Sequence, residues 1–397
     1  MAQPCACSEF FNRREEAGDK ETMKRILMWS ALGLAGTGVA HAQSSVTVFG
    51  VMDLGIQYTN GAGGGSVKAL SNGGLSTSRL GFRGTEDLGG GLRAGFWLEG
   101  SLNPDTGTGR PSNSNNQASG AGTAGPITFD RMSFVSLSSD TLGEVRLGHD
   151  FIPTHYNSIY FDPFNANGVA RAGNLTFAAV GTGPLPTTIT GSNTVSYWLP
   201  PNLGGFYGMA MAGMGESDST VVNRHDGNFA GARFGFASGA FDVAAAVTRS
   251  KFNATATVGN YTHANIGGSW DAGFAKFFAL YNKVTVKLAA GTVRKNTAEI
   301  GAHIPAFEVG RIRISYAYLD DRSDESLRNA NGMPRNRDDA RQFGIGYVHN
   351  LSRRTALYGT YARLMNSGQA RYVVSGGVAP GAGQRSTGWE FGVRHLF

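Results

Sequence analysis

Arginine is the residue type whose spacing in this sequence could do chemistry, because it recurs on one face of segments in which apolar residues alternate with polar or small ones. In residues 79–83, the sequence Arg-Leu-Gly-Phe-Arg sets two arginines and a glycine against two apolar residues, and residues 311–314 read Arg-Ile-Arg-Ile. Successive side chains of a strand point to opposite faces, so such segments place cations on one face and apolar groups on the other. Fixed cations beside water attract anions and repel cations. The pattern therefore predicts strands with one apolar face and one charged face.

Residue types that carry out catalysis or hold metals are scattered. His263, His303 and His349 stand alone, and the sequence contains no Gly-x-Ser-x-Gly nucleophile motif. Acidic residues gather in residues 320–339, but arginines interleave with them, and the ligand spacing of a calcium loop is missing. We interpret that segment as a solvated, salt-bridged loop. We therefore expect no enzymatic activity, no metal and no cofactor.

The composition excludes several classes of protein. The chain has 397 residues, of which 58 are Gly and 16% are charged. Soluble domains average about 25% charged residues and about 7% Gly, so glycine is enriched and charge is depleted. A hydrophobic content of 41% excludes a disordered chain, and Cys5 and Cys7, the two cysteines, cannot make a disulfide framework or a four-cysteine zinc site. The formal charge of +6 is spread along the chain, which argues against a nucleic-acid partner.

The N-terminal region is typical of a targeting sequence behind an unusual leader. Residues 23–42 contain a Met-Lys-Arg start, a nearly uncharged stretch over 26–40 and an Ala-His-Ala cleavage site, which together indicate a signal peptide. The apolar stretch of about 15 residues is too short to span a bilayer. We expect cleavage before Gln43, so that residues 43–397 form one mature domain. Residues 1–22 are interpreted as an upstream extension caused by the choice of start site.

The mature region contains about 16 segments in which apolar and polar residues alternate. They begin near Ser45, Leu75, Gly91, Thr128, Gly143, Asn193, Gly205, Gly227, Gly239, Tyr261, Gly273, Ala298, Gly310, Ala340, Arg354 and Thr387. Fourteen or 18 segments would also fit the chain length, and residues 283–297 fit the alternation least well. The segments are joined in pairs by short links, such as residues 87–90 and 139–142. Long Gly/Ser/Asn-rich stretches separate the pairs, and include residues 103–126, 153–190, 321–339 and 365–386.

Short turns at one edge and long loops at the other are typical of an outer-membrane barrel. After Ala42 no apolar run approaches the length of about 18 residues that a spanning helix needs. In hydrocarbon every backbone amide needs a hydrogen-bond partner, and strands obtain all of theirs only in a closed sheet. A barrel of about 16 strands is too wide for side chains to fill, so its lumen holds water. The predicted fold class is all-β, a 16-stranded antiparallel transmembrane β-barrel.

Several segments resemble one known family. Residues 45–53, Ser-Val-Thr-Val-Phe-Gly-Val-Met-Asp, resemble the first strand of Gram-negative general diffusion porins, above all those of the β-proteobacterial branch with Neisseria, Burkholderia and Bordetella. Residues 78–92, which begin Ser-Arg-Leu-Gly-Phe-Arg-Gly, are similar to the second strand and turn of that family, and are the most specific match. Residues 142–149 resemble the strand before its third loop. Phe397 resembles the terminal residue that the barrel-assembly machinery reads.

The resemblance implies homotrimers in the cell outer membrane, in which each barrel has its own channel narrowed by an inward-folded third loop. The partners that it implies are outer-membrane lipid and lipopolysaccharide, the assembly machinery, and small hydrophilic solutes and ions. The implied function is passive diffusion, for which we expect a mild anion preference. A channel selective for one anion or organic acid is an open alternative. An outer-membrane barrel lipid hydrolase is an alternative of another class.

The resemblance also assigns constriction residues to the barrel wall. Arg79 matches an arginine of the family's basic ladder, and Arg131 matches the ladder arginine of the fourth strand. Arg83 shares its strand face with Arg79, so we expect it to face the lumen as well. One departure bears on the strength of the anion preference: many relatives carry an arginine where residues 190–194 of this chain read Thr-Gly-Ser-Asn-Thr.

Two further candidates lie in the expected third loop, which runs from about residue 152 to 190. The sequence Tyr-Phe-Asp-Pro-Phe over residues 160–164 is similar to the inward segment of that loop in the family. Asp162 is therefore the candidate for the acidic side of the constriction. Arg171 is the candidate for additional positive charge. Opposed charges of this kind would create a field across a narrow aqueous passage.

Overall fold

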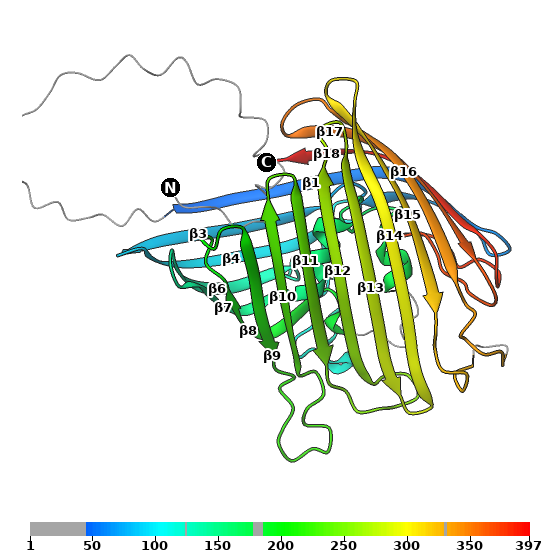
Figure 1. Cartoon of the computed structure of the whole chain (residues 1–397), viewed down its shortest axis with the longest axis horizontal. Helices are drawn as coiled ribbons and strands as arrows, with labels where there is room; N and C mark the ends of the chain where they lie inside the picture. Colours follow the sequence, from blue (N-terminus) through cyan, green and yellow to red (C-terminus); the bar gives the residue numbers. More distant parts are fainter. Residues whose placement is uncertain (1–44, 124, 178–185, 329–331) are drawn as a thin grey trace, which may run out of the picture. The chain divides into compact units, whose positions relative to one another are not determined.

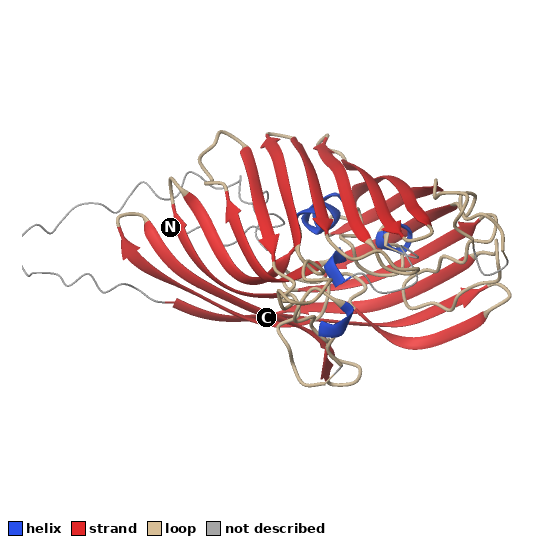
Figure 2. Ribbon diagram, turned by 90° about the horizontal axis from the view of Figure 1, so that it is seen from below, coloured by secondary structure: helices blue, strands red, loops and turns tan. Residues whose placement is uncertain are grey.

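The computed structural model describes the residues 45–123, 125–177, 186–328 and 332–397. The expected signal peptide and upstream extension lie outside the described residues. The described chain forms a twisted antiparallel sheet that closes on itself, with short helices on its inner side (Figure 1; Figure 2). None of the described helices is long and apolar enough to cross a membrane.

In the described residues eighteen strands follow one another: β1 (Ser45–Gly61), β2 (Gly65–Asn72), β3 (Arg79–Gly89), β4 (Leu92–Asn103), β5 (Thr108–Gly109), β6 (Met132–Ser139), β7 (Gly143–Phe151), β8 (Thr190–Trp198), β9 (Phe206–Gly213), β10 (Phe229–Ser238), β11 (Phe241–Ser250), β12 (Asn260–Asp271), β13 (Lys276–Leu288), β14 (Gly291–Ala306), β15 (Gly310–Asp321), β16 (Ala340–Asn350), β17 (Thr355–Asn366) and β18 (Ser386–Leu396). The helical segments between them are η1 (Ala118–Gly120), α1 (Pro153–Phe161), α2 (Gly173–Thr176) and η2 (Pro186–Thr188).

Sixteen of these strands form the barrel wall, and each pairs antiparallel with its neighbours. β18 returns to β1, in a ladder that runs from Val51↔Leu396 to Gly61↔Ser386. β2 and β5 belong to long loops: β2 extends the hairpin after β1, and β5 pairs only with the end of β4. The closed 16-stranded antiparallel barrel predicted from the sequence is confirmed.

The last residue of the chain takes part in closing the barrel. The backbone N–H of Phe397 donates to the carbonyl of Gly50 at 3.1 Å, and the N–H of Gly50 donates to the carbonyl of Phe397 at 3.0 Å. These two bonds extend the ladder between β1 and β18 by one residue pair. Phe397 is therefore part of the seam where the two ends of the sheet meet.

The wall strands start within four residues of the positions expected from the sequence, with one exception. β14 begins at Gly291 rather than at Ala298, because β13 and β14 are long and only Ala289 and Ala290 separate them. In this hairpin the alternation is inverted at the long-loop edge: Val284, Val286 and Val293 are buried in one inward cluster. Lys283 and Lys287 of β13 point outward there, which explains why residues 283–297 fit the expected alternation least well.

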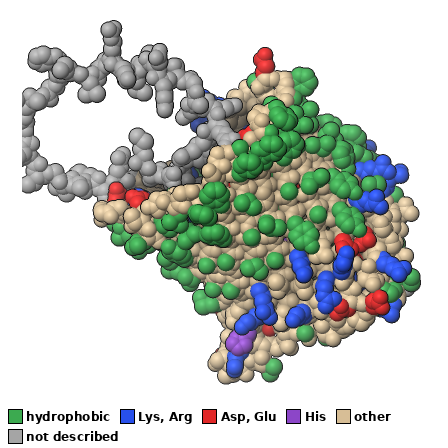
Figure 3. All heavy atoms as spheres, in the orientation of Figure 1, with side chains coloured by type: hydrophobic (Ala, Val, Ile, Leu, Met, Phe, Trp, Pro, Cys, Tyr) green, Lys and Arg blue, Asp and Glu red, His purple; other side chains and the backbone are tan. Residues whose placement is uncertain are grey.

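The wall is apolar outside and polar inside. Val48, Ile56, Phe234 and Ile266 point outward and are 57%, 69%, 55% and 53% exposed. Figure 3 shows this outer surface as a broad band of hydrophobic side chains over the strands. The opposite face is lined with buried polar side chains, including Asp53, Gln57, Glu99, Asn265, Asn282, Arg313, Gln342, Thr360 and Glu390. The alternation predicted from the sequence is confirmed.

The loop between β7 and β8 folds into the barrel. Its helix α1 packs against the inner faces of β10 to β13, and the side-chain amide of Asn157 donates to the Ala244 carbonyl at 3.1 Å and to Asn265 Oδ1 at 3.0 Å. The second half of the loop packs against β15 to β17 through a buried cluster that includes Phe164, Val169, Leu175, Ala317, Leu319, Ala340 and Leu364. The expected inward-folded third loop is confirmed.

Leu175 tests how the third loop is held. Its side chain is 0% exposed, so the Leu175→Ala variant should weaken the attachment of the loop by about 2–5 kcal/mol while the strand ladders stay intact. We expect faster backbone hydrogen exchange over residues 162–177, measured by mass spectrometry in detergent, and unchanged exchange in the wall strands. Leu203→Ala, in the short turn between β8 and β9, is the control. Equal exchange in both variants would contradict this packing role.

Candidate functional site

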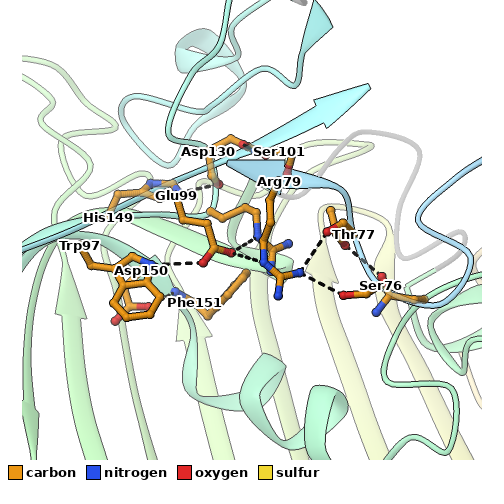
Figure 4. A network of polar contacts seen from close by, with 12 residues as sticks. Ser76, Thr77, Arg79, Trp97, Glu99, Ser101, Asp130, His149, Asp150 and Phe151 are labelled. Atoms are coloured by element: carbon orange, nitrogen blue, oxygen red, sulfur yellow. Dashed lines mark hydrogen bonds and ion pairs between the residues drawn. The ribbon is translucent and has the colours of Figure 1, made fainter. Parts of the chain in front are cut away.

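Arg79 is the first residue of β3 and points into the barrel, where the long loop after β1 meets the wall (Figure 4). Its Nη1 donates to Ser76 Oγ at 3.1 Å and to the Thr77 carbonyl at 3.0 Å. Its Nε lies 3.3 Å from Glu99 Oε1, on the neighbouring strand β4. The guanidinium is thus oriented by contacts on two sides, while the side chain stays 21% exposed.

Arg131 reaches the same carboxylate from the other side. It precedes β6, and its Nε donates to Glu99 Oε1 at 2.5 Å. Its guanidinium lies over the ring of Phe151, 5.0 Å from the centroid. Glu99 is only 3% exposed, and its second oxygen accepts a hydrogen bond from Trp97 Nε1 at 3.2 Å (Figure 4). Two arginines therefore share one buried carboxylate, which leaves an excess of one positive charge.

The backbone around Arg131 is held by two further polar contacts. Asp130 Oδ1 accepts the backbone N–H of Ser101 at 2.6 Å. The Nε2 of His149 lies 2.9 Å from the Asp130 carbonyl, and its Nδ1 lies 2.8 Å from Ser192 Oγ. The imidazole is therefore engaged at both nitrogens and links β7 to the entry of β6 and to β8. His149 acts here as a connector beside the arginines.

Arg171 lies in the inward-folded loop, just before α2, and its Nε donates to Asn174 Oδ1 at 3.3 Å. Burial lowers the pKa of the Arg171 guanidinium, and the positive charge of Arg110 lowers this pKa further. Burial also lowers the pKa of His155 to about 3, and the nearby charge of Arg131 contributes to that shift. These mutual effects place the arginines of the second and third loops in the same electrostatic neighbourhood as Arg131.

Arg110 was missed by the sequence reasoning. It lies in the long loop between β4 and β6, where its Nε donates to Asn103 Oδ1 at 3.2 Å. Asn116 fastens this loop to β8, because its Nδ2 donates to the Ser192 carbonyl at 2.8 Å and its Oδ1 accepts the Ser192 N–H at 2.7 Å. The signal that could have found Arg110 is that it is the only cation in residues 103–126.

Arg83 lies on the same face of β3 as Arg79 but nearer the short-turn edge. Its guanidinium stands over two aromatic rings, 5.5 Å from the centroid of Phe49 and 5.2 Å from that of Trp97. Arg83 therefore faces the interior, where aromatic contacts orient its charge. Glu99 forms ion pairs with Arg79 and Arg131, so Arg83 forms a separate position along the same wall.

Asp162 is enclosed by the third loop itself. It is 1% exposed, and its carboxylate accepts backbone N–H groups of Phe164 at 2.7 Å, Ala166 at 3.1 Å and Ala172 at 2.9 Å. Burial raises the pKa of this carboxyl to about 6, although the N–H donors lower it. The structure thus gives Asp162 a role in shaping the loop. Glu99 is the acid in direct contact with Arg79 and Arg131. The sequence reasoning missed this residue, and the pattern that could have found it is that Glu99 shares its strand face with Trp97 and Ser101.

No cluster in the described residues has the composition of a metal site, since no three His, Cys, Asp or Glu side chains there lie close enough to hold an ion. The chemistry available is electrostatic and geometric. Fixed guanidinium groups line a polar interior that the third loop narrows. Such an arrangement can select solutes by size and by the sign of their charge.

Comparison with known sequences identifies the family. The model of the Gram-negative porins matches residues 29–369. The chain is 37% identical over 385 residues to outer membrane porin protein 32 of Delftia acidovorans, which covers 94% of this chain and 100% of that protein. It is 26% identical over 409 residues to an outer membrane porin of Bordetella pertussis, with 86% of this chain and 94% of that protein covered.

Comparison with solved structures supports the same family assignment. The anion-selective porin from Comamonas acidovorans matches with a TM-score of 0.74 and 35% identity, over 89% of this chain and 100% of that one. OmpT of Vibrio cholerae, solved in a trimer form, matches with a TM-score of 0.60 over 89% of this chain and 99% of that one; its 13% identity shows a shared fold alone.

These relatives are channels, so the alternative of a barrel lipid hydrolase finds no support, and the protein is not an enzyme. The closed barrel, the polar interior and the inward-folded loop described above are the parts that such a channel requires. The chain belongs to the Gram-negative porin family and forms a water-filled channel for the passive diffusion of small hydrophilic solutes and ions across the outer membrane.

Proposed function

We propose that this porin prefers anions and that Arg79, Arg131 and Arg171 are the cations of its constriction. The observation that carries the proposal is the single buried carboxylate of Glu99 between Arg79 and Arg131. Within this group of three side chains, two positive charges against one negative charge leave one positive charge in excess. Fixed charge in a narrow passage with low-dielectric walls attracts the opposite ion. The anion-selective porin from Comamonas acidovorans, 35% identical, supports the sign of this preference.

Two neighbouring arginines strengthen the proposed preference. Arg110 adds a cation from the second loop. Many relatives carry an arginine on another element, the strand that reads Thr-Gly-Ser-Asn-Thr over residues 190–194 of this chain. Arg83 continues the positive face toward the short-turn edge. The carboxylate of Asp162 is enclosed by backbone N–H groups of the third loop, so it offsets the arginines less than an exposed carboxylate would.

Reversing one wall charge should change ion selectivity. Arg79→Glu or Arg131→Glu changes the local charge by two units, and one unit at about 4 Å is worth about 1 kcal/mol even in water. We expect the anion-to-cation permeability ratio to fall severalfold in each variant. The measurement is the reversal potential of single channels in a planar bilayer under a salt gradient.

The matched control for this experiment is Arg353→Glu, which reverses an exposed arginine in the short turn between β16 and β17. Its reversal potential should stay at the wild-type value. If both constriction variants also keep the wild-type value, the assignment of Arg79 and Arg131 is wrong. Conductance that saturates with rising concentration of one anion would instead favour the substrate-selective alternative.

We also propose that the barrel works as a homotrimer that contacts outer-membrane lipid and lipopolysaccharide, and that its terminal strand is read by the barrel-assembly machinery. The family to which the chain belongs supports these partners. The two backbone bonds between Phe397 and Gly50 support a role of the C-terminus in closing the barrel. We further propose that residues 23–42 are removed as a signal peptide, which is compatible with the start of β1 at Ser45.

The C-terminal residue offers a test of assembly. Deletion of Phe397 removes both backbone bonds to Gly50 and should lower the amount of heat-modifiable trimer in the outer membrane at least severalfold. Phe397→Tyr keeps the backbone bonds and the aromatic ring, so it should assemble like the wild type. The measurement is semi-native electrophoresis of membrane fractions. Normal trimer levels after the deletion would contradict the proposed role.

A further inference from the structure

A group of basic side chains lies on the outside of the barrel where β11 to β14 reach the long-loop edge. It consists of Arg249 on β11, Lys283 and Lys287 on β13, and Arg294 on β14, and is called the rim patch below. Figure 3 shows Lys and Arg side chains gathered at this end of the strands, beyond the hydrophobic band. Arg249, Lys283 and Lys287 are exposed.

The alternation of the strands fixes the outward direction of the rim patch. Arg249 has the same parity on β11 as Val243 and Val247, which are 47% and 45% exposed on the outer wall. Lys283 and Lys287 have the same parity on β13 as Tyr281, which is 43% exposed. These cations therefore point away from the lumen and belong to the outer surface of the barrel.

The register of the strands brings the members of the rim patch together. Arg249 pairs with Thr262, Thr262 with Thr285, and Thr285 with Arg294. Neighbouring strands lie about 4.8 Å apart, so this row spans about 15 Å. Lys283 and Lys287 stand on either side of Thr285 along β13. The rim patch is thus one continuous area in which two hydroxyl groups lie between the cations.

The rim patch carries a surplus of positive charge. Arg294 donates to the carboxylate of Asp324. Within the described chain, no ion pair with an acidic side chain is seen for Arg249, Lys283 or Lys287. Three cations therefore remain uncompensated on a surface that faces outward. A phosphate group carries the opposite charge and accepts hydrogen bonds from ammonium, guanidinium and hydroxyl donors.

The position of the rim patch along the barrel corresponds to the level of lipid headgroups. Tyr281 lies two residues before Lys283 on β13, farther from the long-loop edge. Ile266 pairs directly with Tyr281 and is 53% exposed on the outer wall. Aromatic residues mark the boundary of the hydrocarbon in outer-membrane barrels, and the long loops face the cell exterior. The cations beyond Tyr281 consequently lie beside the phosphate groups of outer-leaflet lipids.

We propose that Arg249, Lys283 and Lys287 bind the phosphate groups of an anionic outer-leaflet lipid of the lipid A type, with the hydroxyls of Thr262 and Thr285 as additional donors. This gives the lipid contact proposed above a defined site. It rests on the outer-membrane location of the barrel and is independent of the charge selectivity of the pore. The two proposals can therefore fail separately.

The test compares lipid binding by the full-length protein in detergent, using native mass spectrometry. The probes are bisphosphorylated lipid A and zwitterionic phosphatidylcholine. The wild type should retain lipid A in preference to phosphatidylcholine. The triple variant Arg249→Gln, Lys283→Gln, Lys287→Gln should bind lipid A at least tenfold more weakly. The control Arg353→Gln, Arg354→Gln removes exposed cations at the short-turn edge and should bind like the wild type.

Three outcomes would overturn the proposal: equal binding of lipid A by the triple variant, equal weakening by the control, or displacement of lipid A by inorganic phosphate at equal concentration. The triple variant must keep wild-type conductance, which shows that its barrel is intact. Should the triple variant fail to fold, the three single variants replace it. Each should then weaken binding about twofold to fivefold, and unchanged binding in all three overturns the proposal.

Discussion

The hydrogen-bonding need of the backbone is the constraint from which the rest of this structure follows. In hydrocarbon an unpaired amide costs several kcal/mol, so a sheet in the membrane cannot keep free edges. β1 and β18 would be the two open edges of the sheet. The ladder between them, extended by the bonds between Gly50 and Phe397, pairs these edges with each other. Closure of sixteen strands fixes a width that side chains on the wall cannot fill. Water therefore occupies the lumen, and the inner faces of the strands must be polar where no loop packs against them.

The third loop narrows this wide lumen. Its apolar residues, such as Phe164 and Leu175, pack against the inner wall, and Asp162 gathers three backbone N–H groups that shape the turn. With the passage narrowed, the charges on the remaining wall gain influence over each passing ion. Arg79 and Arg131 keep a fixed direction because Glu99 and the neighbouring loop bind them. The alternation that makes the outside apolar thus also places Arg79 inside, whereas Arg131 precedes β6 and reaches Glu99 from the end of the loop before that strand.

The parts of the fold that depend on local patterns could be predicted from the sequence. Strand periodicity, the short turns and the polarity of the two faces are all local, so most strand starts were found within four residues. β14 was misplaced because beyond the hydrocarbon the valines of the β13–β14 hairpin turn inward and the lysines outward. The contact of Glu99 with Arg79 and Arg131 depends on register across three strands, and the positions of Asp162 and Arg110 depend on loop paths. A single sequence encodes neither register nor loop path in a readable form.

The central claim is that a wet lumen with a net positive constriction runs through a lipid-covered barrel. The most direct measurement is the reversal potential of the wild-type protein in a planar bilayer with potassium chloride at two concentrations. The account predicts stepwise channels whose conductance rises in proportion to salt concentration and whose reversal potential has the sign of chloride preference. A reversal potential of the opposite sign would contradict the electrostatic account, and the absence of channel current would contradict the pore itself.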